Sequence, residues 1–252
     1  MRNRKMIRIR AVQDKEFKNS YWSFDISGEM AKASKEFKRQ FGVGFELITD
    51  IGDWDSIGSS DLRNFPFNLI QAIPKAISIE EIIDYLVNAC QEKIELFLEI
   101  SQNEKDEMCS KLRGQSLEYQ IGFLEARLES WLKDYFSQDL EEKAPMDSET
   151  GAVIAFTGKF SIKSLWSGTV REGNVIFTKK AYILIRNYWT SNIKPSKIIL
   201  HEFGHLFGAE DIEDSSVVSV MTQKPKVITY EFDDKNKQII LEKLKKIRER
   251  FI

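Results

Sequence analysis

The opening fifty residues show two spacings of apolar side chains. Residues 7–11 read Ile-Arg-Ile-Arg-Ala, the alternation of a half-buried strand. Between residues 25 and 41 the apolar residues recur on one face of a helix, and a glycine-containing turn follows at 42–44. The run at 45–49 predicts a second strand. The residues on the helical face are Met30, Ala33, Phe37 and Phe41. The pattern therefore predicts strand, helix, strand.

Residues 78–142 change to long helical patterns. Ser78 and Glu81 match a capping box that opens one helix, and a second helix follows Gly114. The first stripe comprises Ile79, Ile83, Leu86, Cys90, Ile94 and Phe97, and the second Leu117, Ile121, Leu124, Leu128, Trp131 and Tyr135. Alternating steps of four and three are typical of packed helices. We therefore expect a helical hairpin, inserted at 78–142 into a single domain spanning 1–252, that packs against the main body; a lid or a docking arm is the alternative.

The last hundred residues return to short strands and then to helices. Strands are expected at 152–156 and 174–178, and Pro195 suits the first turn of a helix. A closing helix begins at Asp234. Its apolar face comprises Ile240, Leu244, Ile247 and Phe251. Together these elements predict an α+β fold with a mixed twisted sheet.

Composition narrows the classes of partner. The 252 residues carry 37 Lys+Arg and 39 Asp+Glu, a net charge of −2 that indicates no surface for nucleic acid. No apolar run is long enough to span a membrane, and no secretory signal is evident, so we expect a cytoplasmic protein without a membrane partner. Cys90 and Cys109 form no Cys-x-x-Cys pair and are interpreted as inert structural thiols.

Both histidines of the chain lie in the segment His-Glu-Phe-Gly-His at 201–205. On a helix, His201 and His205 point the same way, and two imidazoles so placed can bind one metal ion. Glu202 is offset by about 100°. It can therefore reach a water on the open side of the metal, where hydrolysis needs a general base. The residues expected to anchor the opposite face are Ile199, Phe203 and Leu206.

The continuation of this segment predicts a third ligand. Gly208 can take the left-handed conformation that ends a helix and turns the chain, which would bring Asp211 back toward the histidines. Two nitrogens and one carboxylate leave the fourth tetrahedral position of Zn²⁺ for water, as in catalytic sites. We therefore predict that His201, His205 and Asp211 bind zinc. Glu231 is an alternative third ligand, although its surroundings lack a metal-binding spacing.

The segment from His201 to Asp211 resembles the zinc motif of the metzincin metallopeptidases, HExxHxxGxx(H/D), in its aspartate variant. Metzincins also carry a methionine in a tight turn beneath the metal, and Met221 is the candidate here. The resemblance implies a metzincin-like catalytic domain with an active-site helix and a C-terminal helix. It also implies a zinc endopeptidase that cleaves peptide or protein substrates, with Glu202 as the catalytic base and Gly208 and Met221 in structural roles.

Two other functional classes use the same residues. Two histidines and one carboxylate are also the ligands of mononuclear iron enzymes, although a glutamate between the histidines favours hydrolysis. A non-catalytic, zinc-stabilised binding module is the second alternative, with the helical insertion as its partner surface.

Overall fold

The chain forms two compact units. A computed structural model of the protein describes residues 6–19, 23–56, 78–94, 99–147, 150–158, 177–179, 182–186, 194–223 and 226–250. The first unit comprises Met1–Asp55, Leu140–Gly158 and Glu172–Ile252, and the second comprises Ser56–Asp139 and Lys159–Arg171. The expectation of one domain with an insertion at 78–142 stays a prediction.

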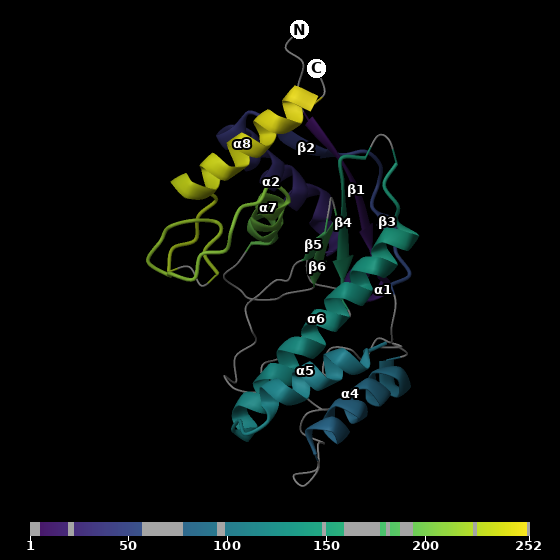
Figure 1. Ribbon diagram of the computed structural model, residues 1–252. Helices are drawn as coiled ribbons and strands as arrows, with labels where there is room; N and C mark the ends of the chain where they lie inside the picture. Colours follow the sequence, from purple (N-terminus) through teal and green to yellow (C-terminus); the bar gives the residue numbers. More distant parts are fainter. Residues whose placement is uncertain are drawn as a thin grey trace. The chain divides into compact units, whose positions relative to one another are not determined.

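The first unit contains a mixed sheet in the strand order β2-β1-β4-β6-β5, with β3 also paired to β1 (Figure 1). The strands are β1 (Met6–Gln13), β2 (Gly44–Leu47), β3 (Gly52–Asp53), β4 (Ala152–Thr157), β5 (Phe177–Lys179) and β6 (Tyr182–Arg186). All described pairings are parallel except that of β5 with β6. The mixed sheet was predicted, but its mostly parallel pairing gives an α/β arrangement rather than the expected α+β one. Parallel neighbours need crossover connections, and the pattern did not reveal β6.

The N-terminal strand, helix and strand are confirmed. Helix α2 (Ile26–Phe41) connects β1 to β2, and these strands are parallel. The helix ends at Gly42, whose φ of +70° lies in the left-handed region that glycine adopts without strain. The short helix α1 (Lys15–Lys18) and the 3₁₀ turn η1 (Ser23–Asp25) precede α2.

An aromatic cluster joins α2 to helix α7 (Pro195–Leu206). The ring of Phe37 lies 5.2 Å from that of Phe203 and 5.4 Å from that of Phe207, between ring centroids. Phe232, which precedes helix α8 (Asp234–Arg250), contacts the same cluster. Ring pairs at these distances contribute attraction beyond the apolar area that they bury. The cluster therefore holds one face of α7 against α2.

The described part of the second unit is helical. It contains α4 (Ile79–Ile94), α5 (Gln102–Leu112) and the greater part of α6 (Leu117–Lys143). The capping box is confirmed, because the Glu81 amide donates to Ser78 Oγ at 3.2 Å and the Ser78 amide to Glu81 Oε2 at 2.7 Å. Instead of the expected hairpin, the described residues of 78–142 form three helices. The apolar pattern missed α5 because its buried side chains cluster at its end, and Ser101 caps its start.

The two predicted stripes differ in how much of their length is buried. Ile83, Leu86, Leu124 and Leu128 are fully buried, whereas Leu117 at the start of α6 is 56 % exposed. Phe97 lies outside the described residues. Cys90 and Cys109 are free and buried, and burial raises the pKa of the Cys90 thiol to about 12. None of the described helices is long and apolar enough to cross a membrane.

Candidate metal centre

Helix α7 carries three of the predicted site residues. Pro195 occupies its first turn, and the carboxylate of Glu29 on α2 accepts the Ser196 N–H at 2.8 Å, which satisfies a donor at the start of the helix. Ile199 and Phe203 are fully buried, as expected for the face opposite the ligands. The other face of α7 carries the histidines.

The side chains of His201, His205 and Asp211 converge on one point. Asp211 Oδ1 lies 3.1 Å from His201 Nε2 and 3.5 Å from His205 Nε2, and the two Nε2 atoms are 3.2 Å apart. Zinc bonds of about 2.0–2.1 Å place tetrahedral ligand atoms about 3.3–3.4 Å from one another. The three atoms are therefore spaced like three corners of a zinc tetrahedron.

Two main-chain carbonyls orient the imidazoles. His201 Nδ1 donates to the Val220 carbonyl at 2.9 Å, and His205 Nδ1 donates to the Ala209 carbonyl at 2.7 Å. A carbonyl oxygen can only accept, so each neutral ring carries its proton on Nδ1 and keeps a lone pair on Nε2. The Nε2 lone pairs of the two histidines face the Asp211 carboxylate. Two imidazole nitrogens and one carboxylate oxygen placed this close together are stable when they surround a cation. The residues therefore fit a bound metal ion.

Gly208 turns the chain from the end of α7 back to the histidines. Its φ is +87°, and its N–H donates to the His205 carbonyl at 3.0 Å while the Ala209 N–H donates to that of Gly204 at 3.2 Å. This pair of bonds defines a Schellman motif, which glycine accommodates because it has no side chain. The turn places the Ala209 carbonyl where it accepts a hydrogen bond from His205 Nδ1. It also directs the chain so that Asp211 lies beside the two histidines, which is the turn that the sequence predicted.

Met221 lies in a tight turn against the underside of α7. The Thr222 N–H donates to the Ser219 carbonyl at 3.2 Å, and Met221 is fully buried. A Cβ atom on Gly204, between the two histidines, would lie 3.1 Å from Met221 Sδ and 2.7 Å from Phe232 Cε1. Glycine at this position therefore lets both side chains pack directly beneath the two histidines.

Glu202 is 1 % exposed and lies beside the metal-binding atoms. Its Oε1 is 3.5 Å from His201 Nε2, and its Oε2 finds no hydrogen-bond donor among the described residues. Burial, together with the negative charge of Asp211, raises the pKa of the Glu202 carboxyl well above its ordinary value. Burial acts the same way on Asp211, but contacts with His201 and His205 outweigh it and lower the pKa of that carboxyl. The pKa values of these two neighbouring carboxyls are therefore shifted in opposite directions.

A polar clamp from α8 holds the loop that carries Asp211. Asn236, which is fully buried, accepts the Glu210 N–H at 2.7 Å and donates to the Glu210 carbonyl at 3.1 Å. Its amide also donates to Asp233 at 2.8 Å, and Asp233 in turn accepts from Ser219 Oγ at 2.9 Å. The loop of Asp211 and the turn of Met221 are therefore tied to the start of the same helix.

Sequence reasoning missed these supporting groups. Val220 and Ala209 act through main-chain carbonyls, which no side-chain pattern reveals. Asn236 follows Asp233 by three residues, and the Asp233 carboxylate accepts the Asn236 N–H at 3.1 Å, as at the start of a helix. That capping signal was available, but it did not indicate that the amide side chain reaches Glu210.

Glu231, the alternative third ligand, does not join the cluster. Its carboxylate contacts the Arg39 guanidinium and lies 3.6 Å from Lys237 Nζ. Among the described residues, the group that could hold a metal consists of His201, His205 and Asp211. The structure therefore gives Glu231 a role in surface ion pairs.

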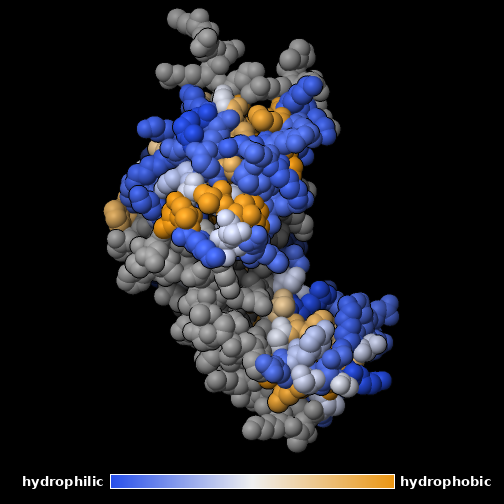
Figure 2. Space-filling model, turned by 90° about the vertical axis from the view of Figure 1, so that its left-hand side faces the viewer, coloured by the Kyte–Doolittle hydropathy of each residue, from blue (hydrophilic) through white to orange (hydrophobic). Residues whose placement is uncertain are grey.

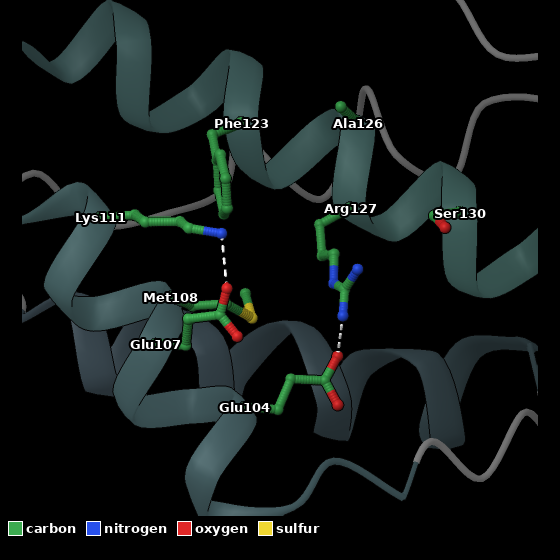
Figure 3. A pocket seen from close by; sticks show the side chains of 8 residues that line it. All are labelled: Glu104, Glu107, Met108, Lys111, Phe123, Ala126, Arg127 and Ser130. Carbon is green, nitrogen blue, oxygen red and sulfur yellow. Dashed lines mark hydrogen bonds and ion pairs between the residues drawn. The ribbon is translucent and has the colours of Figure 1, made fainter.

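The second unit contains a pocket of about 250 Å³ between α5 and α6 (Figure 3). Its charged groups pair with one another, Glu104 with Arg127 and Glu107 with Lys111 (Figure 3). The remaining lining residues are Met108, Phe123, Ala126 and Ser130. This lining offers neither a histidine nor an unpaired carboxylate, so the candidate site lies in the first unit.

Over the whole chain, the similarity to known proteins is low. The chain matches no family model and no curated protein. One solved structure similar to it is described as a zinc-dependent peptidase from Methanocorpusculum labreanum. The two chains share 12 % identity, with 92 % of this chain and 99 % of the other covered, at a TM-score of 0.37.

Proposed function

We propose that the protein is a zinc-dependent peptidase of the metzincin type. The observation that carries the proposal is the convergence of His201 Nε2, His205 Nε2 and Asp211 Oδ1 at 3.1–3.5 Å, with both imidazoles oriented by main-chain carbonyls. His201, His205 and Asp211 would hold Zn²⁺, and Met221 and Gly208 would support them.

Glu202 would act as the general base and then as the general acid. When bound, zinc polarises the scissile carbonyl and makes a neighbouring water more acidic. The raised pKa of Glu202 suits a carboxylate that takes a proton from water and later delivers it to the leaving amine. Its unpartnered Oε2 supports this role because no described donor competes for it.

An exposed apolar surface near the turn of Met221 supports a peptide substrate. Val218, Val227 and Ile228 flank this turn in sequence and are about half exposed. Figure 2 shows apolar side chains gathered on this face of the molecule. Contiguous exposed apolar surface commonly takes part in binding, and we infer that these side chains contribute to substrate binding.

The conservative variant Glu202→Gln tests the catalytic assignment. It should lower kcat/KM for peptide cleavage by about 10²–10⁴-fold, the usual contribution of a general base, while the protein retains its zinc. Glu210→Gln is the matched control, because Glu210 lies in the adjacent loop and pairs with Lys235 on the surface. Cleavage that survives in Glu202→Gln would contradict the hydrolytic role.

The same ligand set fits Fe²⁺, so metal analysis is part of the test. Purified protein should contain zinc, and added zinc should restore cleavage after chelation. A protein that holds iron and cleaves no peptide would support the alternative of a mononuclear iron enzyme. Zinc that stabilises the fold without any cleavage would instead support a non-catalytic binding module.

A further inference from the structure

Gln40, in the last turn of α2, is bonded to the main chain of the segment that precedes α8. Its side-chain amide donates to the Tyr230 carbonyl at 2.8 Å, and its Oε1 accepts the Phe232 N–H at 3.0 Å. In a parallel β-ladder, one residue of the neighbouring strand bonds to the same two groups, a carbonyl and an N–H two positions apart. The amide of Gln40 therefore takes the place of a strand's main chain and holds residues 230–232.

The same segment presents its other edge to the tight turn beneath α7. The Val220 N–H donates to the Glu231 carbonyl at 2.6 Å. In an extended chain, successive residues turn their main-chain groups to opposite edges, so the carbonyls of Tyr230 and Glu231 have different partners. Residues 230–232 are therefore bonded to Gln40 along one edge and to Val220 along the other.

Val220 connects this segment to a proposed zinc ligand. It is fully buried, and its carbonyl accepts a hydrogen bond from His201 Nδ1 at 2.9 Å. The N–H and the carbonyl belong to one residue with two soft dihedral angles, so a bond that fixes the N–H limits how far the carbonyl can move. A continuous chain of hydrogen bonds therefore leads from Gln40 to His201.

Apolar packing brings the side chain of Gln40 to this segment. The rings of Phe37 and Phe41 lie 6.3 and 5.3 Å from that of Phe232, between ring centroids. Gln40 follows Phe37 by three residues and precedes Phe41 by one, so it lies at the edge of the same face of α2. The aromatic contacts hold the side chain of Phe232, and Gln40 holds its main chain.

The second histidine is oriented in a different way. His205 Nδ1 donates to the Ala209 carbonyl at 2.7 Å, and the Ala209 N–H donates to the Gly204 carbonyl at 3.2 Å. These contacts are local to the end of α7. The orientation of His205 therefore depends on its own helix, whereas that of His201 depends on a turn that residues 230–232 support.

We propose that Gln40 is a positioning residue of the metal centre, which orients His201 through residues 230–232 and Val220. This inference rests on the proposed function, because it concerns one of the proposed zinc ligands. Hydrogen bonds to the second nitrogen of a metal-binding histidine fix the orientation of its ring and raise metal affinity. Loss of the Gln40 contacts should therefore weaken zinc binding through His201 and leave the support of His205 intact.

The variant Gln40→Met keeps the length of the side chain and removes both hydrogen bonds. Its zinc affinity, measured by competition with a chromogenic chelator, should fall by about tenfold, the lower end of the range for groups that orient metal-binding histidines. In the metal-free protein, hydrogen exchange followed by NMR should become about tenfold faster at the Val220 amide, because local opening there becomes easier. Exchange at the Ala209 amide should not change. A general loss of stability would instead accelerate exchange at both amides.

Arg39→Met is the matched control. Arg39 is adjacent to Gln40 and contacts the same segment, but it does so through the side chain of Glu231 and at the exposed surface. Exposed ion pairs contribute little to stability. Arg39→Met should therefore change neither the zinc affinity nor the exchange rate at Val220.

Gln40→Glu replaces Gln40→Met if that variant does not fold, because a glutamate can still accept the Phe232 N–H but cannot donate to Tyr230 when ionised. Unchanged zinc affinity, exchange that accelerates equally at Val220 and Ala209, or an equal effect of the control variant would overturn the inference. Wild-type protein that binds zinc but cleaves no peptide would overturn the proposed function alone. The zinc affinities and exchange rates would then still decide the role of Gln40.

Discussion

Replacing Asn236 with alanine should loosen the loop that carries Asp211. The Asn236 side chain forms two hydrogen bonds with the Glu210 main chain, at 2.7 and 3.1 Å, and one with Asp233 at 2.8 Å. The residue before Asp211 is therefore held in place by α8. Asn236→Ala removes all three bonds and fills none of the space.

The expected magnitude follows from these contacts. Each hydrogen bond contributes about 0.5–1.5 kcal/mol, and a buried donor left without a partner costs about 1–3 kcal/mol. We therefore expect Asn236→Ala to lower the free energy of unfolding by about 2–4 kcal/mol. Supporting residues of metal sites typically change metal affinity by 10–100-fold, so zinc should bind more weakly by that factor.

Competition with a chromogenic chelator measures zinc affinity, and thermal unfolding with and without zinc measures stability. Added zinc should raise the Tm of Asn236→Ala less than that of the wild type, because weaker binding provides less stabilisation. Gln238→Ala is the control, since the exposed side chain of Gln238 bonds to Glu242 on the surface of the same helix. A lower Tm with unchanged zinc affinity would refute the idea that the clamp positions Asp211.

Three further predictions concern packing, pH and thiol reactivity. Gly204→Ala should cost about 1–3 kcal/mol and weaken zinc binding, because its Cβ would lie 2.7 Å from Phe232 and 3.1 Å from Met221; an unchanged Tm would contradict this packing. Burial opposes the ionisation of Asp233, but bonds from Asn236 and Ser219 prevail and lower its pKa. Ionised Asp233 should therefore stabilise the fold at pH values above its ordinary pKa of 3.8, and this stabilisation should be lost as the pH falls through the lower pKa of the folded state. In acid titrations of the Tm, Asp233→Asn should lose less stability than the wild type. Equal losses in the two proteins would argue against this explanation. With a pKa of about 12, Cys90 should resist iodoacetamide at pH 8 until the protein unfolds, as mass spectrometry would show; rapid labelling of the folded chain would disagree.

The sequence was most informative where one spacing determined one structure. His201 and His205 share a helical face because four residues make about one turn, and Gly208 ends that helix because its φ of +87° suits glycine. The capping box of Ser78 and Glu81 was equally local. Such features depend on neighbouring residues, so they can be predicted without the rest of the fold.

Long-range features could not be obtained in this way. The order of strands in the sheet, with β4 between β1 and β6, depends on which crossovers pack together. Helix α5 is too polar for its short apolar stripe to stand out. At the candidate site, the Val220 carbonyl and the Asn236 amide reach their partners across 19 and 26 positions of the chain. Such contacts cannot be predicted from the pattern of side chains along the sequence.

The strongest test of the peptidase assignment is to restore zinc to metal-free protein while following cleavage of a peptide library. Protein stripped by a chelator should cleave nothing. Activity should return in proportion to added zinc and stop rising at one zinc ion per chain, because His201, His205 and Asp211 form one three-ligand group. Cleavage that persists without metal, or zinc bound at this ratio with no cleavage of any peptide, would contradict the account.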